Sequence, residues 1–160
     1  MTDAEFRQAA ETYGDTIFRV AYHSLKNRAD AEDVMQTVLL RLYEYQKPFE
    51  GEEHVKHWLI RVAVNESRKL LRSFWRRNTL ALEEQLDRPV FDRPEQSELY
   101  DAVMALPEKY RLTVYLYYYE DYSVREIAEA LKTNPSTVQT WLMRARGRLR
   151  DDLMPEEELT

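Results

Sequence analysis

Apolar residues recur at three- and four-residue spacing along most of this chain, which is the pattern of amphipathic helices. Alternating runs of β-branched residues, which would favour strands, are few. Six prolines interrupt the pattern and divide it into segments. The sequence therefore predicts an all-α protein, with helices over residues 3–26, 31–46, 53–75, 95–105, 107–119, 124–131 and 135–150.

Three of the expected helices begin with a capping signal. Asp30 can cap the second helix. Ser123 and Glu126 have the spacing of a capping box. Asn134 stands directly before Pro135, so a capping residue would precede a proline at the first helical position.

Residues 77–94 break the helical pattern. They contain two prolines and four acidic residues, and we expect an extended acidic linker there. The linker would separate an N-terminal helical domain, residues 1–76, from a smaller C-terminal helical domain, residues 95–153. An acidic tail, residues 154–160, would follow the second domain.

Several classes of protein are disfavoured by the composition. The longest apolar run, residues 114–119, has six residues, whereas about 20 are needed to cross a bilayer, so we expect no membrane insertion. The chain has no cysteine, which excludes disulfides and thiolate metal sites. Its acidic start lacks the apolar stretch of a secretory signal. We therefore expect a cytoplasmic protein.

The charge is distributed unevenly. The formal total is −6, which by itself would argue against binding to nucleic acid. Residues 54–77 and 132–150 nevertheless carry a combined charge of +11, and the other 117 residues carry −17. A single basic segment can be a solvated helix face, but two dense ones favour contacts with nucleic acid.

The last two expected helices, joined by a short turn, have the length and spacing of a helix-turn-helix. The outward residues expected to bind DNA are Ser136, Gln139, Thr140, Met143, Arg144 and Arg146. Short polar side chains suit base edges, and arginines suit phosphates or guanine. The alternative is a helical hairpin with a solvated arginine face.

Lys132 stands in the turn where positive φ is common, which would cost a lysine about 1 kcal/mol.

A basic stripe runs along the expected helix over residues 53–75. The stripe comprises Arg61, Asn65, Arg68, Arg72 and Arg76, apart from an expected apolar arc of Val55, Leu59, Val62, Ala63 and Leu70. Aromatic side chains beside basic ones suit single-stranded nucleic acid. The expected strand-binding residues are Trp58, Arg61, Asn65, Arg68, Lys69 and Arg72. Core packing is the alternative for Trp58.

The expected helix over residues 31–46 has a second outward face. This face carries Asp33, Gln36, Leu40 and Tyr43 opposite the apolar side of the helix. Outward Leu40 and Tyr43 among polar residues suggest a protein-binding patch. Isolated apolar residues are also common on ordinary surfaces, so this indication is weaker than the charge pattern.

Five segments in order carry a resemblance to a known family. They are residues 30–36 (DAEDVMQ), 57–65 (HWLIRVAVN), 106–111 (LPEKYR), 122–128 (YSVREIA) and 136–146 (STVQTWLMRAR). With these segments the chain resembles bacterial RNA polymerase sigma factors of the extracytoplasmic-function (ECF) type, in the sigma-70 family. The resemblance covers nearly the whole chain. It departs from the family pattern at Thr37, Lys132, Thr133, Gln139 and Trp141, which leaves the preference for DNA sequence open.

The resemblance implies a function and partners. The protein would bind core RNA polymerase and direct promoter recognition and transcription initiation, without a cofactor. Asp33 and Gln36 would contact the polymerase clamp, as part of the patch with Leu40 and Tyr43. Arg61 and Asn65 would lie near the −10 strand, in a domain like sigma region 2. The outward residues of the last helix would face the −35 major groove, in a domain like sigma region 4. An anti-sigma protein is a common further partner.

Two other functions compete with this interpretation. The first is an enzyme. His54 and His57 lie three residues apart on one helix and could share a metal, but no third ligand has suitable spacing, and no catalytic motif is present. The tyrosines at positions 115, 117, 118, 119 and 122 are expected in the core or between domains rather than in enzyme chemistry. The second alternative is a stand-alone helix-turn-helix regulator with an N-terminal sensing or dimerisation domain.

Overall fold

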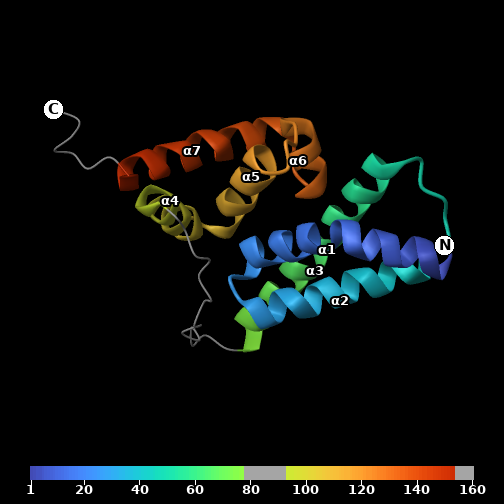
Figure 1. Cartoon of the computed structure of the whole chain (residues 1–160). Helices are drawn as coiled ribbons and strands as arrows, with labels where there is room; N and C mark the ends of the chain where they lie inside the picture. The colour runs from blue at the N-terminus through green and yellow to red at the C-terminus, as the bar shows by residue number, and fades with distance from the viewer. Residues whose placement is uncertain (78–92, 154–160) are drawn as a thin grey trace. The chain divides into compact units, whose positions relative to one another are not determined.

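The computed structural model describes residues 1–77 and 93–153, and these residues form seven helices and no strand (Figure 1). In chain order they are α1 (Asp3–Leu25), α2 (Arg28–Glu44), α3 (Glu52–Arg77), α4 (Pro94–Met104), α5 (Glu108–Tyr118), α6 (Val124–Ala130) and α7 (Pro135–Leu153). The predicted all-α class is confirmed. Most of the expected linker and the whole expected tail lie outside the described residues, while Arg77 and Pro94 at the ends of that linker are helical.

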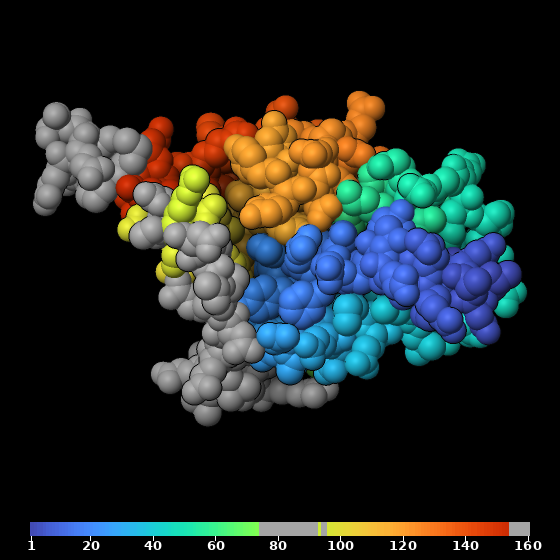
Figure 2. Space-filling model, in the orientation of Figure 1, coloured from blue at the N-terminus to red at the C-terminus, as the bar shows by residue number. Residues whose placement is uncertain are grey.

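The chain divides into two compact units, one formed by α1 to α3 and the other by α4 to α7. In the N-terminal unit, α1 packs against both α2 and α3, and α2 also packs against α3. The largest fully buried side chains of this unit are Ile17, Val20, Val38, Leu42, Leu59, Ile60 and Val64. The exposed sides of α1 and α2 form one continuous surface of the unit (Figure 2). No helix in the described ranges is long and apolar enough to cross a membrane.

The buried face of α3 differs from the expected apolar arc. Leu59 and Ala63 are buried as expected, but Val55, Val62 and Leu70 are only partly buried. Buried instead are Ile60, Val64 and Ser67. The reason is that α3 packs against α1 and α2 together, so the residues that face the seam between those two helices become the core.

The expected cap of α2 is wrong. Asn27 caps the helix, because its side-chain oxygen accepts the backbone N–H of Asp30 at 2.9 Å. Arg28 begins the helix, so Asp30 lies within the first turn. There the pKa of Asp30 is raised, mainly by partial burial and secondly by the nearby charge of Asp33.

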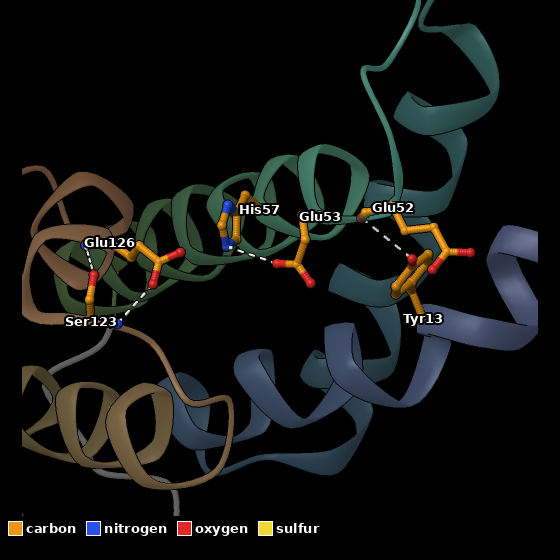
Figure 3. A network of polar contacts seen from close by, with 6 residues as sticks. All are labelled: Tyr13, Glu52, Glu53, His57, Ser123 and Glu126. Atoms are coloured by element: carbon orange, nitrogen blue, oxygen red, sulfur yellow. Dashed lines mark hydrogen bonds and ion pairs between the residues drawn. The ribbon is translucent and has the colours of Figure 1, made fainter.

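The other two expected caps are confirmed. In α6, the N–H of Glu126 donates to Ser123 Oγ at 3.1 Å, and the N–H of Ser123 donates to a Glu126 carboxylate oxygen at 2.8 Å (Figure 3). In α7, the N–H of Thr137 donates to Asn134 Oδ1 at 2.9 Å, directly before Pro135. These bonds satisfy donors that the first helical turn leaves without partners.

The C-terminal unit is built around α7, which packs against α4, α5 and α6. One part of its core comprises Leu106, Tyr110, Val114 and Ala145, with Val103, Trp141 and Leu149 packed against them. Ile127, Ala128, Val138 and Leu142 are buried where α6 and α7 meet. The predicted helix-turn-helix is therefore present in α6 and α7. Tyr115 and Tyr122 are buried as expected, but Tyr118 and Tyr119 are 53% and 75% exposed.

Arg111 is a buried cation in this unit, with only 5% of its surface exposed. Its Nη1 donates to the carbonyl oxygen of Leu106 at 2.7 Å and to that of Met104 at 3.4 Å. Burial lowers the pKa of Arg111 to about 10, and the carboxylate of Glu108 opposes that shift. Because this pKa remains well above neutral, the guanidinium stays charged and binds the carbonyl groups of the last α4 residue and of the turn that follows it.

Lys132 adopts the left-handed conformation that the turn pattern predicts, with φ of 56°. Replacing Lys132 by glycine is expected to raise the free energy of unfolding by about 0.5 kcal/mol, because relief of about 1 kcal/mol of strain exceeds the lost attraction to the end of α6. Urea denaturation, followed through Trp141 after replacing Trp58 and Trp75 by phenylalanine, would measure it. Glu129→Gly, inside α6, should instead lower stability by about 1 kcal/mol. A lower free energy of unfolding in Lys132→Gly would contradict the proposed backbone strain at Lys132.

Candidate nucleic-acid interface

The outward side of α7 carries the six residues predicted to bind DNA, and we call it the α7 face. Ser136, Gln139, Met143, Arg144 and Arg146 are exposed and Thr140 is half-buried. Ser136 Oγ donates to Asn134 Oδ1 at 2.7 Å, and Thr140 Oγ1 donates to the carbonyl oxygen of Ser136 at 3.1 Å. The two hydroxyls are thus oriented by their own helix, and their oxygens keep lone pairs that can accept. Met143, 65% exposed, supplies an apolar contact between the polar residues.

Arg146 differs from the other arginine on the α7 face because two tyrosines hold it. Its Nε donates to the Tyr118 hydroxyl at 2.7 Å. Its guanidinium carbon lies 5.5 Å from the ring centroid of Tyr117 and 5.7 Å from that of Tyr118. Hydrogen bonding to Tyr118 raises the pKa of Arg146, so it remains charged. No local sequence pattern predicts this contact, because Arg146 and Tyr118 lie 28 positions apart in the chain.

Trp141 lies away from the α7 face. It is half-buried and packs against the core cluster of Leu106, Tyr110, Val114 and Ala145. Lys109 Nζ lies 5.6 Å from the Trp141 ring centroid. The unusual tryptophan at this position therefore contributes to packing, whereas the unusual Gln139 is exposed on the α7 face itself.

On α3, the residues of the predicted basic stripe and the flanking Lys69 differ in exposure. Arg61, Lys69 and Arg72 are exposed, and Asn65 and Arg68 are half-buried. We call these five residues the α3 stripe. The side chain of Arg76, the last residue of the expected stripe, lies outside the described residues. The α3 stripe carries four cations on one helix, which attracts a polyanion and repels other cations.

Trp58 belongs to an aromatic cluster that the sequence analysis missed. Its ring centroid lies 4.8 Å from that of Tyr45 and 5.7 Å from that of Phe49. Phe49 also contacts Tyr45, at 5.0 Å, and the ring of His54, at 5.1 Å. His54 Nδ1 accepts the backbone N–H of Glu50 at 2.9 Å, which fixes the connection between α2 and α3. The Trp58 side chain therefore packs against other rings and is also partly exposed to solvent.

Acidic residues of α3 have partners within the N-terminal unit. Glu66, only 14% exposed, forms an ion pair of 2.7 Å with Arg41 of α2. Glu53 lies 3.7 Å from His57, and the Tyr13 hydroxyl donates to the carbonyl oxygen of Glu52 at 3.5 Å (Figure 3). Within residues 1–77 and 93–153 no group of three histidines or carboxylates could hold a metal ion. His54 and His57 instead contact Glu50 and Glu53.

The outward face of α2 carries the four residues predicted to bind a protein, and we call it the α2 patch. Asp33 and Gln36 are exposed, Leu40 is 57% exposed and Tyr43 is 51% exposed. Tyr43 also contacts α1, since its hydroxyl donates to an Asp3 carboxylate oxygen at 3.2 Å and its ring lies 5.1 Å from that of Phe6. Leu40 thus supplies most of the unengaged apolar surface of the patch.

Comparison with known proteins identifies the family. Residues 9–77 match the family Sigma-70 region 2, and residues 96–149 match Sigma-70, region 4. The RNA polymerase sigma-E factor of Streptomyces coelicolor is 31% identical over 160 residues, which cover 96% of this chain and 88% of that relative. The ECF RNA polymerase sigma factor SigW of Bacillus subtilis is 27% identical, over 92% of this chain and 88% of that relative. This chain belongs to the sigma-70 family, as an ECF sigma factor.

The fold agrees with this assignment. A solved structure of the sigma factor RpoE, in complex with the anti-sigma factor NepR from Bartonella quintana, matches this ECF sigma factor with a TM-score of 0.77 and 22% identity. The match covers 95% of this chain and 98% of that one. As a sigma factor, the protein works with core RNA polymerase in promoter recognition and transcription initiation. It thus belongs to a class of DNA-recognition subunits.

Proposed function

We propose that this ECF sigma factor contacts a promoter through two separate surfaces. The α3 stripe, together with Trp58, would bind the opened strand of the −10 element. The α7 face would read the −35 element as duplex. The observation that carries this proposal is that each unit presents one basic helix face, although the whole chain is acidic. The domain boundaries that we propose are residues 1–76 for the first function and 95–153 for the second.

The −10 assignment is supported by charge and by aromatic side chains. Three exposed cations of α3, Arg61, Lys69 and Arg72, can follow a phosphate backbone. Trp58 offers an aromatic surface that is already in contact with Tyr45 and Phe49. Bases that leave a duplex regain stacking energy on such rings, so a partly exposed aromatic group beside cations favours the separated strand.

The −35 assignment is supported by the geometry of α6 and α7. The capped start of α7 presents Ser136 and Gln139, which are short enough to meet base edges in a major groove. Arg144 lies further along α7 and can reach guanine or a phosphate. A stand-alone regulator would use the same helix pair, but it has no need for a strand-binding stripe on a second unit.

Run-off transcription with core polymerase tests the function directly. The template is a promoter fragment selected from random duplexes by the polymerase together with this protein. We expect a discrete transcript only when the protein is present. A transcript of equal yield without the protein would exclude a sigma function, and tight binding to the template without polymerase would favour the stand-alone regulator.

Arg144→Ala tests the reading of the −35 element. If Arg144 binds a guanine, the substitution is expected to weaken binding to the selected −35 sequence by about 1–3 kcal/mol while changing binding to a scrambled sequence much less. Electrophoretic mobility of the polymerase complex on both duplexes measures the two affinities. Arg7→Ala, an exposed arginine of α1, is the matched control. An unchanged affinity for both duplexes would remove Arg144 from the α7 face contacts.

Asp33→Arg tests the α2 patch as the polymerase-binding surface. We expect the substitution to reduce co-purification with core polymerase at least tenfold, because it places a cation where the clamp would meet a carboxylate. Glu11→Arg, at an exposed position of α1, makes the same change of charge and should have little effect. Equal losses in both variants would indicate a general charge effect rather than a specific contact.

Three further parts of the function are also proposals. The protein would act in the cytoplasm, where polymerase and chromosome are found, and would perform no catalysis of its own. An anti-sigma protein would control it, since the RpoE structure of similar fold was solved with one. Affinity purification of the full chain from its own cells, with and without the Asp33→Arg substitution, would separate an anti-sigma partner from polymerase.

A further inference from the structure

Tyr118 and Arg146 form a fixed pair at the edge of the α7 face. Tyr118 is the last residue of α5, and its hydroxyl accepts the Nε–H of Arg146 at 2.7 Å. Tyr117 packs edge-on against Tyr118, with ring centroids 4.9 Å apart and planes at 76°. Arg146 lies within 6 Å of both ring centroids. Two rings and one hydrogen bond therefore restrict a side chain that would otherwise sample many rotamers.

The pair keeps hydrogen-bond donors for a ligand. The bond uses the Nε–H of Arg146 and a lone pair of Tyr118, so the tyrosine hydroxyl keeps its own proton to donate. The two terminal amino groups of Arg146 carry four further N–H donors, more than its side-chain hydrogen bond with Tyr117 uses. Tyr118 and Arg146 are both exposed, so solvent and ligands can reach these donors. A fixed cation beside a hydroxyl donor suits an oxyanion with two free oxygens, such as a phosphodiester.

The position of the pair indicates which phosphodiester. Arg146 follows Gln139 by seven residues and Met143 by three, so all three lie along one side of α7. A helix whose first turns enter a major groove brings its later residues toward the backbone that borders the groove. Glu120 is the acidic residue nearest to Tyr118 in the sequence. Its carboxylate accepts a hydrogen bond from the Tyr115 hydroxyl at 2.7 Å, so it is bound to a residue other than Tyr118 or Arg146.

We propose that Tyr118 and Arg146 form a binding site for one phosphodiester of the DNA backbone beside the −35 element. Tyr117 is a positioning residue that acts through Arg146. The inference rests on the proposed −35 function of α7 and adds the class of ligand and a residue from α5. Arg146 would then contribute affinity that is independent of base sequence, in contrast to Gln139 and Arg144 on the same face.

The first test measures how salt affects binding. The full chain with core polymerase is titrated against the selected promoter duplex and against a duplex with a scrambled −35 element. Arg146→Gln should weaken binding to both about fivefold at 0.15 M salt and should reduce the slope of log K against log salt by about 0.9. Tyr118→Phe, which keeps the cation, should weaken both without changing the slope. Tyr119→Phe, next in the chain and 75% exposed, is the matched control.

The second test locates the phosphate. Single methylphosphonate linkages, which carry no charge, are placed in turn along the backbone beside the −35 element. We expect one position to weaken binding of the wild-type complex and to have no effect on the Arg146→Gln complex. Tyr118→Phe combined with Arg146→Gln should be no weaker than Arg146→Gln alone by more than about twofold, because the two residues act as one site.

The outcomes separate this site from the function on which it rests. If the wild-type complex ignores the −35 element, the proposed function fails and the site fails with it. If the wild type reads the element but every methylphosphonate weakens Arg146→Gln as it weakens wild type, the site alone is overturned. Loss of affinity in Arg146→Gln for the selected sequence only would also overturn it, because Arg146 would then read a base.

Discussion

Replacing Arg68 and Arg72 together by alanine is expected to reduce the rate of promoter opening more than about tenfold, while association with core polymerase is unchanged. Each cation that contacts a single strand releases counterions, with a slope of about 0.7 in log K against log salt, which amounts to about fourfold in affinity at 0.15 M. Two such contacts therefore multiply to more than tenfold. Reactivity of unpaired thymines to permanganate, followed over time, measures the opening of the promoter.

The control for this pair is Arg7→Ala with Arg19→Ala, which removes two exposed cations from α1. Because Arg68 is half-buried, circular dichroism of both double variants should verify that the helices are retained. If Arg68→Ala with Arg72→Ala lost polymerase binding instead of opening, the α3 stripe would face polymerase rather than DNA. A slope against salt that does not change would likewise contradict contact with the strand.

Replacing Arg111 by methionine is expected to lower the free energy of unfolding of the C-terminal unit by about 2–3 kcal/mol. Methionine has a similar length but cannot donate, so the carbonyl groups of Leu106 and Met104 lose the buried donor that contacts them. The gain from no longer burying a charge offsets part of this loss. Urea denaturation followed through Trp141 fluorescence, with Trp58 and Trp75 replaced by phenylalanine, measures it.

Arg125→Met is the matched control for Arg111→Met, since it makes the same substitution at an exposed position of α6. We expect its effect to lie within about 0.5 kcal/mol of zero. A similar small effect for Arg111→Met would show that the buried carbonyl groups find other donors. Arg111→Lys should lie between the two, because an ammonium is one point of donation rather than a fork.

Local sequence signals predicted the helices well, because their causes lie within a few residues. The capping box of Ser123 and Glu126 needs only four consecutive residues, and it forms as expected. The error at Asp30 has the same local origin. Asn27 and Asp30 are both residue types that can cap a helix. Asn27 is the cap in the structure, and α2 is one turn longer than it would be with Asp30 as the cap. The pattern contains both solutions, and tertiary packing selects between them.

The candidate surfaces were predicted less completely, because several depend on contacts between distant residues. The exposure of Gln139, Met143 and Arg144 follows from helical spacing alone. The hydrogen bond from Arg146 to Tyr118 depends on how α5 meets α7, which no local pattern contains. The contacts of Phe49 with Trp58 likewise depend on the path of the chain between α2 and α3. Sequence periodicity predicts which side of a helix is buried, but not which other element packs against that side.

The order of the helices in the chain affects how the protein folds during translation. Because α1, α2 and α3 follow one another directly in the chain and pack on one another, this unit is a helical domain whose packing needs no later part of the chain. Helical domains with such contacts fold within microseconds to milliseconds, whereas translation adds only roughly 5–20 residues per second. We therefore expect α1 to α3 to be folded seconds before α7 has been synthesised. Translation, rather than a search among conformations, would then set how soon a newly made molecule is ready to act.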